Sequence, residues 1–201
     1  KASLNGLWLV TGCVDSTVRV WRYDGQNMDL RATLCGHEGG HITCIDLSTV
    51  FGTIVTGCAM GNVLLWDLRT LTFMRRLRHP FKEKAKKLPG AASDNPSISV
   101  SINHKNGNIV TLVGSHLSVF DINGQFLSSV GPGEYFGPHS RPSCAVSTDC
   151  PEWMDQGIVA VTGHVNGEIR FWGLDYDARI LKMRHLMMDR AHRCAITALK
   201  V

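Results

Sequence analysis

The sequence predicts an all-β protein that repeats one small unit along the chain. In the clearest copy, Ile54–Leu68, an apolar run ending in Thr-Gly is followed by Gly-Asn and then by a second apolar run ending in Trp-Asp. Two strand-length apolar segments separated by turn residues are typical of a β-hairpin. Three relatives of this hairpin occur elsewhere, so we interpret the chain as four copies of one unit.

The four copies align on a threonine and on the aromatic residue that follows it. The pairs are Thr11 with Trp21, Thr56 with Trp66, and Thr162 with Trp172, each ten residues apart, and Thr111 with Phe120, nine apart. The aromatic residues lie 45, 54 and 52 positions apart. Four-stranded propeller blades repeat every ~40–45 residues, so the second and third intervals indicate insertions.

We therefore expect residues 1–201 to form a single, partial β-propeller of about four blades, plus the first strand of the next. The expected hairpins lie near 7–22, 52–68, 107–122 and 157–173, with loop insertions near 78–96 and 131–141. Smaller features are an inner strand at Ile42–Leu47, one helical turn at Pro151–Asp155 and the start of a fifth blade at Ile196–Leu199.

The composition, with 44% hydrophobic and 19% charged residues, is that of an ordinary globular protein. The chain does not begin with Met, and we expect it to be part of a longer protein. Its seven cysteines are odd in number, contain no Cys-x-x-Cys pair and fall partly in apolar runs, which favours reduced thiols in the core over disulfides. No cofactor is indicated.

The chain resembles the WD40 family, in which a His, a Ser or Thr, a turn Asp and a Trp form a buried hydrogen-bonded set in each blade. A buried indole, imidazole or hydroxyl must find partners, and a closed network fixes the blade. The residues matched to this set are Thr11, Asp15 and Trp21 in the first copy; His37, Thr56 and Trp66 in the second; and Thr162, Asn166 and Trp172 in the fourth. Met60 stands where the second Asp is expected, His139 is a doubtful fourth-copy histidine, and the third copy has no intact set.

A narrower resemblance rests on three stretches. These are Val63–Leu68 with Leu71–Leu77, Gly107–Thr111 with Asp121–Gln125, and Gly163–Trp172. They are similar to the C-terminal propeller of BEACH-domain proteins, which are large scaffolds of membrane traffic and autophagy. The resemblance implies a non-catalytic module that binds proteins through its face and loops. It also implies a cytoplasmic location, peripheral on endomembranes. Another WD40 adaptor is the alternative.

One motif suggests catalysis and is set aside. His37-Glu38-Gly39-Gly40-His41 fits the His-Glu-x-x-His pattern of zinc proteases, which requires both histidines on one face of a helix. Two glycines inside that helix would cost roughly 2 kcal/mol relative to alanine, and the flanking sequence is strand–turn–strand. We predict no metal site and no enzyme.

The excess positive charge is concentrated between Arg69 and Lys87. This segment has eight basic residues and one acid, Glu83, whereas the rest of the chain is mildly acidic. Candidate contacts to an anionic partner are Arg75, Arg76, Arg78, Lys82, Lys84, Lys86 and Lys87. The alternatives are an anionic lipid, an acidic peptide, or a solvated loop beside an edge strand. Nucleic acid is disfavoured because no aromatic residues interleave with the lysines.

Overall fold

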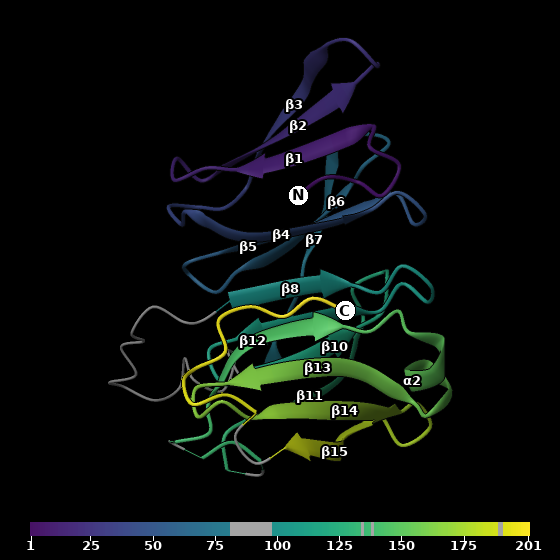
Figure 1. The fold of residues 1–201 in the computed structure, drawn as a ribbon. Helices are drawn as coiled ribbons and strands as arrows, with labels where there is room; N and C mark the ends of the chain where they lie inside the picture. The colour runs from purple at the N-terminus through teal and green to yellow at the C-terminus, as the bar shows by residue number, and fades with distance from the viewer. Residues whose placement is uncertain (81–97, 134, 138, 189–190) are drawn as a thin grey trace.

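The computed structural model describes residues 1–80, 98–133, 135–137, 139–188 and 191–201 (Figure 1). Within them the chain forms a row of antiparallel sheets and one short helix, α2 (Pro151–Asp155). No helix in the described part of the chain is long and apolar enough to cross a membrane.

The strands fall into four consecutive sheets, which we call blades 1 to 4. Blade 1 contains β1 (Trp8–Gly12), β2 (Thr17–Tyr23) and β3 (Met28–Cys35); blade 2 contains β4 (Ile42–Ser48), β5 (Thr53–Cys58), β6 (Val63–Asp67) and β7 (Thr72–Arg76); blade 3 contains β8 (Ile98–Ile102), β9 (Ile109–Val113), β10 (His116–Phe120) and β11 (Phe126–Val130); blade 4 contains β12 (Pro142–Ser147), β13 (Ile158–His164), β14 (Ile169–Asp175) and β15 (Ile180–Met188). Each strand pairs with its neighbour in sequence, so every blade is a meander. This confirms the all-β, partial-propeller prediction.

Blade 1 has three strands where the others have four. The first residues of the chain lie beside β1, where the other blades have their inner strand. Ala2 forms an isolated antiparallel bridge with Leu9, and the Lys1 carbonyl accepts a hydrogen bond from Val10 N. At the other end, the fifth-blade strand expected at Ile196–Leu199 is not formed. Among the described residues, this segment is assigned to no strand, although Ser143 Oγ on β12 donates a hydrogen bond to the Ile196 carbonyl.

The inner strands β4, β8 and β12 lie next to one another and are joined by polar side chains. The Asp46 carboxylate accepts hydrogen bonds from Leu47 N and, across the blade boundary, from Ile102 N at 2.9 Å. Ser101 and Ser147 share a hydrogen bond of 2.8 Å between blades 3 and 4. Lys1 Nζ lies 3.0 Å from Asp46 Oδ1. These contacts hold the inner strands in register.

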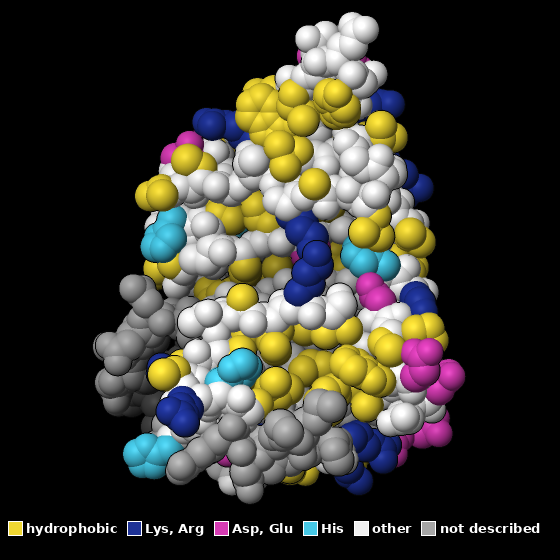
Figure 2. Space-filling view, viewed as in Figure 1, with side chains coloured by type: hydrophobic (Ala, Val, Ile, Leu, Met, Phe, Trp, Pro, Cys, Tyr) yellow, Lys and Arg dark blue, Asp and Glu magenta, His cyan; other side chains and the backbone are white. Residues whose placement is uncertain are grey.

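Apolar side chains fill the space between successive blades. One cluster lies between blades 1 and 2, another between blades 2 and 3 and a third between blades 3 and 4. The outward face of blade 4 carries a smaller cluster, Ile158, Val161 and Phe171, with Trp153 from α2 packed against it. Hydrophobic side chains also gather over blade 1, at the top of Figure 2. All seven cysteines are free thiols; Cys58 and Cys144 are buried, whereas Cys35 and Cys194 are exposed.

The glycine of each Thr-Gly pair has no side chain, so the inner segment of the next blade can lie directly against it. A Cβ added at Gly12 would lie 2.3 Å from an atom of Ile42, one at Gly57 would lie 2.9 Å from Ile98, and one at Gly163 would lie 2.6 Å from Ile196. Ile42 N and Ile196 N also donate to equivalent carbonyls, each at 3.1 Å. Ile196 therefore holds the position of the first residue of a further inner strand, although its segment is not paired as a strand.

We predict that Gly57→Ala lowers the free energy of unfolding by about 1–3 kcal/mol, because the new methyl would overlap Cys44 Sγ and Ile98 and overpack the boundary between blades. Gly137→Ala is the matched control, since its Cβ would meet only Ser140 Oγ at 3.6 Å. Urea unfolding of both variants measures the difference. Equal midpoints for the two variants would contradict the role given to Gly57.

Candidate functional site

In blade 2 a threonine hydroxyl joins an indole to an imidazole. Trp66 Nε1 donates to Thr56 Oγ1 at 2.8 Å, and His37 Nε2 lies 2.7 Å from the same oxygen. All three side chains are buried. Thr56 lies on β5 and Trp66 on β6, whereas His37 comes from the turn before β4. The structure thus brings together the three residues that the sequence assigns to this blade.

The network of blade 2 ends at His37 Nδ1, which is buried and has no hydrogen-bond partner among the described residues. Burial, and secondarily the positive charge of Arg76, lower the pKa of His37 to about 4, so the ring is neutral at physiological pH. The side chain at position 60, where the matched pattern has Asp, is a largely exposed methionine. One ring nitrogen of the imidazole is therefore left without a partner among the described residues of this blade.

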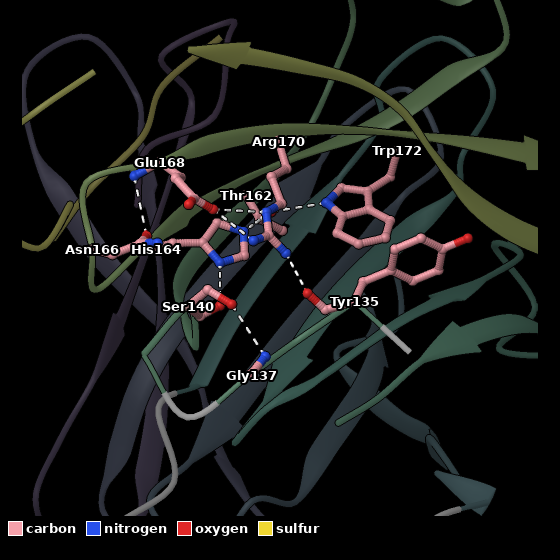
Figure 3. Close-up of polar contacts among 9 residues, drawn as sticks. All are labelled: Tyr135, Gly137, Ser140, Thr162, His164, Asn166, Glu168, Arg170 and Trp172. Atoms are coloured by element: carbon pink, nitrogen blue, oxygen red, sulfur yellow. Dashed lines mark hydrogen bonds and ion pairs between the residues drawn. The ribbon is translucent and has the colours of Figure 1, made fainter. Parts of the chain in front are cut away.

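Blade 4 has a complete network with a different histidine (Figure 3). Trp172 Nε1 donates to Thr162 Oγ1 at 2.8 Å, and His164 Nε2 lies 2.8 Å from that hydroxyl. His164 Nδ1 lies 2.7 Å from the Ser140 carbonyl, which can only accept. His164 therefore carries its proton on Nδ1, and the Thr162 hydroxyl donates to Nε2. Burial lowers the pKa of His164 to about 4.

This assignment corrects the histidine suggested for blade 4. His139 is exposed, whereas His164, two residues after Thr162 on β13, is fully buried and takes the place in the network. Asn166 is not part of it, because its Oδ1 accepts a hydrogen bond from Glu168 N and shapes the β13–β14 turn. The Thr-x-His spacing was visible in the sequence, but nothing in it showed that the imidazole could fold back onto Thr162.

Within 131–141, where an irregular connection is expected, the described residues Tyr135, Phe136 and Ser140 lie against the blade 4 network. The ring centroids of Tyr135 and Phe136 lie 5.5 and 5.3 Å from that of Trp172. Arg170 holds the segment in place by donating to the Tyr135 carbonyl. The same guanidinium pairs with Glu168 at 2.6 Å. The described part of this connection is therefore held by aromatic packing and by the hydrogen bond from Arg170 to the Tyr135 carbonyl.

Blade 3 repeats the arrangement without an indole. Phe120 replaces the tryptophan and is fully buried, and the His79 ring packs edge-on against it with centroids 5.1 Å apart. Thr111 Oγ1 donates to the Ser118 carbonyl at 3.5 Å. His79 precedes β8 as His37 precedes β4. The intervening insertion hid this equivalence in the sequence, so His79 was missed.

Blade 1 keeps the indole bond but leaves it exposed. Trp21 Nε1 donates to Thr11 Oγ1 at 3.0 Å, with Trp21 half-buried and Thr11 open to solvent. Asp15 accepts hydrogen bonds from the backbone and hydroxyl of Thr17, and these bonds lower the pKa of its carboxyl group. Asp15 therefore organises the β1–β2 turn.

The zinc-protease pattern does not form a zinc site. His37 is buried against Thr56, whereas His41 is exposed, and the segment between them is a turn rather than a helix. In the described part of the chain, no group of three His, Cys, Asp or Glu side chains could hold a metal ion.

The basic segment is only partly described. Lys82, Lys84, Lys86 and Lys87 lie outside the described residues. The three arginines, Arg75, Arg76 and Arg78, are exposed and line one groove of about 510 Å³ beside β7. The structure therefore gathers the arginines on one surface.

Thr56→Val should lower the free energy of unfolding by about 1–3 kcal/mol per buried group left without a partner, because Trp66 and His37 both lose the hydroxyl. Thr11→Val is the control, since water can replace its exposed hydroxyl, and we expect a change within about 0.5 kcal/mol. Denaturant unfolding compares the two. Similar losses in both variants would show that burial of the network does not matter.

Met60→Asp places a carboxylate at the position where the matched pattern has Asp, and we expect it to accept a hydrogen bond from His37 Nδ1. We expect about 1 kcal/mol of added stability from one new buried hydrogen bond, and a His37 pKa that rises from about 4 because the carboxylate favours the charged ring. Met60→Leu is the control and should change neither quantity. Histidine titration by NMR together with urea unfolding checks both, and an unaltered His37 pKa would refute the assignment.

Comparison with known proteins agrees with this architecture. The family model described as "WD domain, G-beta repeat" matches residues 2–22 and 28–67. The chain is 29% identical over 169 residues to the WD repeat- and FYVE domain-containing protein 4 of Homo sapiens, covering 82% of this chain and 5% of that protein.

Two plant proteins match over a similar length. Protein SPIRRIG of Arabidopsis thaliana is 30% identical over 176 residues, which cover 85% of this chain and 4% of that protein. BEACH domain-containing protein A2 of the same plant is 31% identical over 176 residues, with the same coverage. The chain thus spans only a small part of the curated relatives that it matches. It contains WD40 repeats and forms a set of propeller blades similar to a short stretch of BEACH-domain proteins.

Proposed function

We propose that this chain is a non-catalytic protein-interaction module of a larger BEACH-type protein. The observation that carries the proposal is that the buried polar side chains of blades 2 and 4 hydrogen-bond within the fold. The imidazoles and hydroxyls of blades 2 and 4 bond to indoles, to one another or to a backbone carbonyl, and they hold the blades rather than face a cavity. Rigid blades that present loops and edges suit a binding scaffold.

The cellular role rests on likeness to the relatives. Similarity to BEACH domain-containing protein A2 supports a BEACH-type scaffold. That this scaffold works in vesicle traffic or autophagy, in the cytoplasm and peripherally on endomembranes, is proposed from the family resemblance alone. A different WD40 adaptor is the alternative, and a BEACH domain elsewhere in the same polypeptide would decide between them. Anionic-lipid binding through residues 69–87 is less favoured, because the described part of this segment places three arginines in a groove that also has apolar walls.

Proximity labelling of the full-length parent protein tests the proposal. Removal of residues 1–201 should abolish labelling of a defined set of neighbouring proteins, because the module is their contact. Thr11→Val, which alters one exposed hydroxyl, should retain that set. Identical neighbours with and without the segment would contradict the proposed function. Unchanged fractionation with endomembranes on removal would contradict the peripheral location.

A further inference from the structure

A groove runs along the outer strand of blade 2, between β7 and the β10–β11 turn of blade 3. Its blade 2 wall contains Phe73, Met74 and the three arginines of the basic segment, and its blade 3 wall contains Gly124 and Phe126. Its volume is about 510 Å³. The groove therefore joins two blades and is open along a strand.

The groove carries positive charge that the described residues do not neutralise. No carboxylate of the described residues lines it, and none of its three arginines forms an ion pair with another described residue. The nearby acids are engaged elsewhere: Asp67 accepts hydrogen bonds from the β6–β7 turn and pairs with Arg69, and Asp121 accepts from Gln125 N. Guanidinium groups bind carboxylates through paired, charge-assisted hydrogen bonds, so this surface suits an acidic ligand.

The walls of the groove are also apolar. Phe73 is 54% exposed and Met74 is 44% exposed. The Phe73 ring is fixed by edge-on contact with Trp66, with centroids 5.6 Å apart. A Cβ added at Gly124 would lie 2.8 Å from Cδ of Arg75, so the glycine leaves room for the arginine stem to lie across the turn. A ligand with both acidic and apolar side chains would match these walls better than a phosphorylated headgroup.

The backbone of β7 offers a further recognition element. β7 pairs with β6 and with no other strand of the described residues, so one edge of it has no strand partner. Extended peptides bind exposed sheet edges by adding a strand. Two copies of β7 would oppose arginine to arginine, which disfavours self-association at this edge, whereas an acidic strand would be attracted.

We propose that this groove binds an extended acidic peptide segment of a protein partner, one that carries several carboxylates and at least one apolar side chain. The carboxylates pair with Arg75 and Arg78, the apolar side chain contacts Phe73 and Met74, and the peptide backbone adds to the free edge of β7. This inference rests on the proposed function and names the class of partner.

Fluorescence anisotropy with the 201-residue chain tests the inference. The probe is a labelled octapeptide, Asp-Glu-Phe-Glu-Val-Asp-Leu-Glu, with a version carrying Lys at every acidic position as the charge control. We expect saturable binding of the acidic peptide only. Arg75→Gln/Arg78→Gln should weaken it roughly tenfold or more, since two charge-assisted contacts are lost. Arg31→Gln, at an exposed arginine on the outer strand of blade 1, should bind like the wild type.

A second variant and a second ligand make the result decisive. Met74→Glu places a carboxylate in the groove and should also weaken the acidic peptide. Vesicles of phosphatidylcholine with phosphatidylserine should bind the wild type and Arg75→Gln/Arg78→Gln equally. If Arg75→Gln/Arg78→Gln lost vesicle binding but kept peptide binding, the ligand of the groove would be a lipid surface and the inference would be overturned. Equal binding of the acidic peptide by the wild type and all variants would also overturn it. If the full-length parent protein with Arg75→Gln/Arg78→Gln still labelled the same neighbouring proteins, the groove would not be their binding site, while the proposed function would stand.

Discussion

The architecture of blades 2 to 4 depends on covering one aromatic side chain in each, on the third strand of the blade. In blades 2 to 4 an aromatic or imidazole ring from the segment before the inner strand packs onto it. His37 lies on Trp66, His79 on Phe120 and Phe136 on Trp172, with centroids 6.5, 5.1 and 5.3 Å apart. Where that aromatic is tryptophan, its buried N–H adds a second requirement, which a threonine hydroxyl meets. Each connecting segment is thereby fixed to the blade that follows it.

The two indole-centred networks show different degrees of closure. In blade 4 hydrogen bonds run from indole to hydroxyl, to imidazole and to the Ser140 carbonyl, so every buried polar atom in the chain of bonds has a partner. In blade 2 the same order stops at the imidazole. Hydrogen bonding is therefore less complete in blade 2 than in blade 4, although blade 2 keeps the fuller sequence pattern. The His37 nitrogen that has no partner among the described residues costs free energy, because a buried polar group has given up its hydrogen bonds to water. Agreement with a motif and completeness of hydrogen bonding are separate properties.

Periodicity predicted the all-β architecture and part of the candidate site, but it also predicted a strand at Ile196–Leu199 that is not formed. The Thr-to-Trp spacing placed the hairpins, and the Thr-Gly pairs marked where the next segment packs closely. Sequence reasoning failed where the partner came from an unexpected position. His164 replaces a histidine expected before the strand, and His79 is separated from its blade by an insertion. A hydrogen bond or ring contact requires proximity in space, which a fixed spacing does not supply once loops vary in length. For the groove, the sequence predicted all three arginines but not their blade 3 neighbours, Gly124 and Phe126.

The rate of hydrogen exchange at the tryptophan indole N–H groups, measured by NMR on the 201-residue chain, tests the central claim most directly. We expect strong protection for Trp66 and Trp172, whose bonds to threonine are buried, and rapid exchange for Trp21, whose threonine partner is exposed. Exchange at Trp66 or Trp172 as fast as at Trp21 would contradict it.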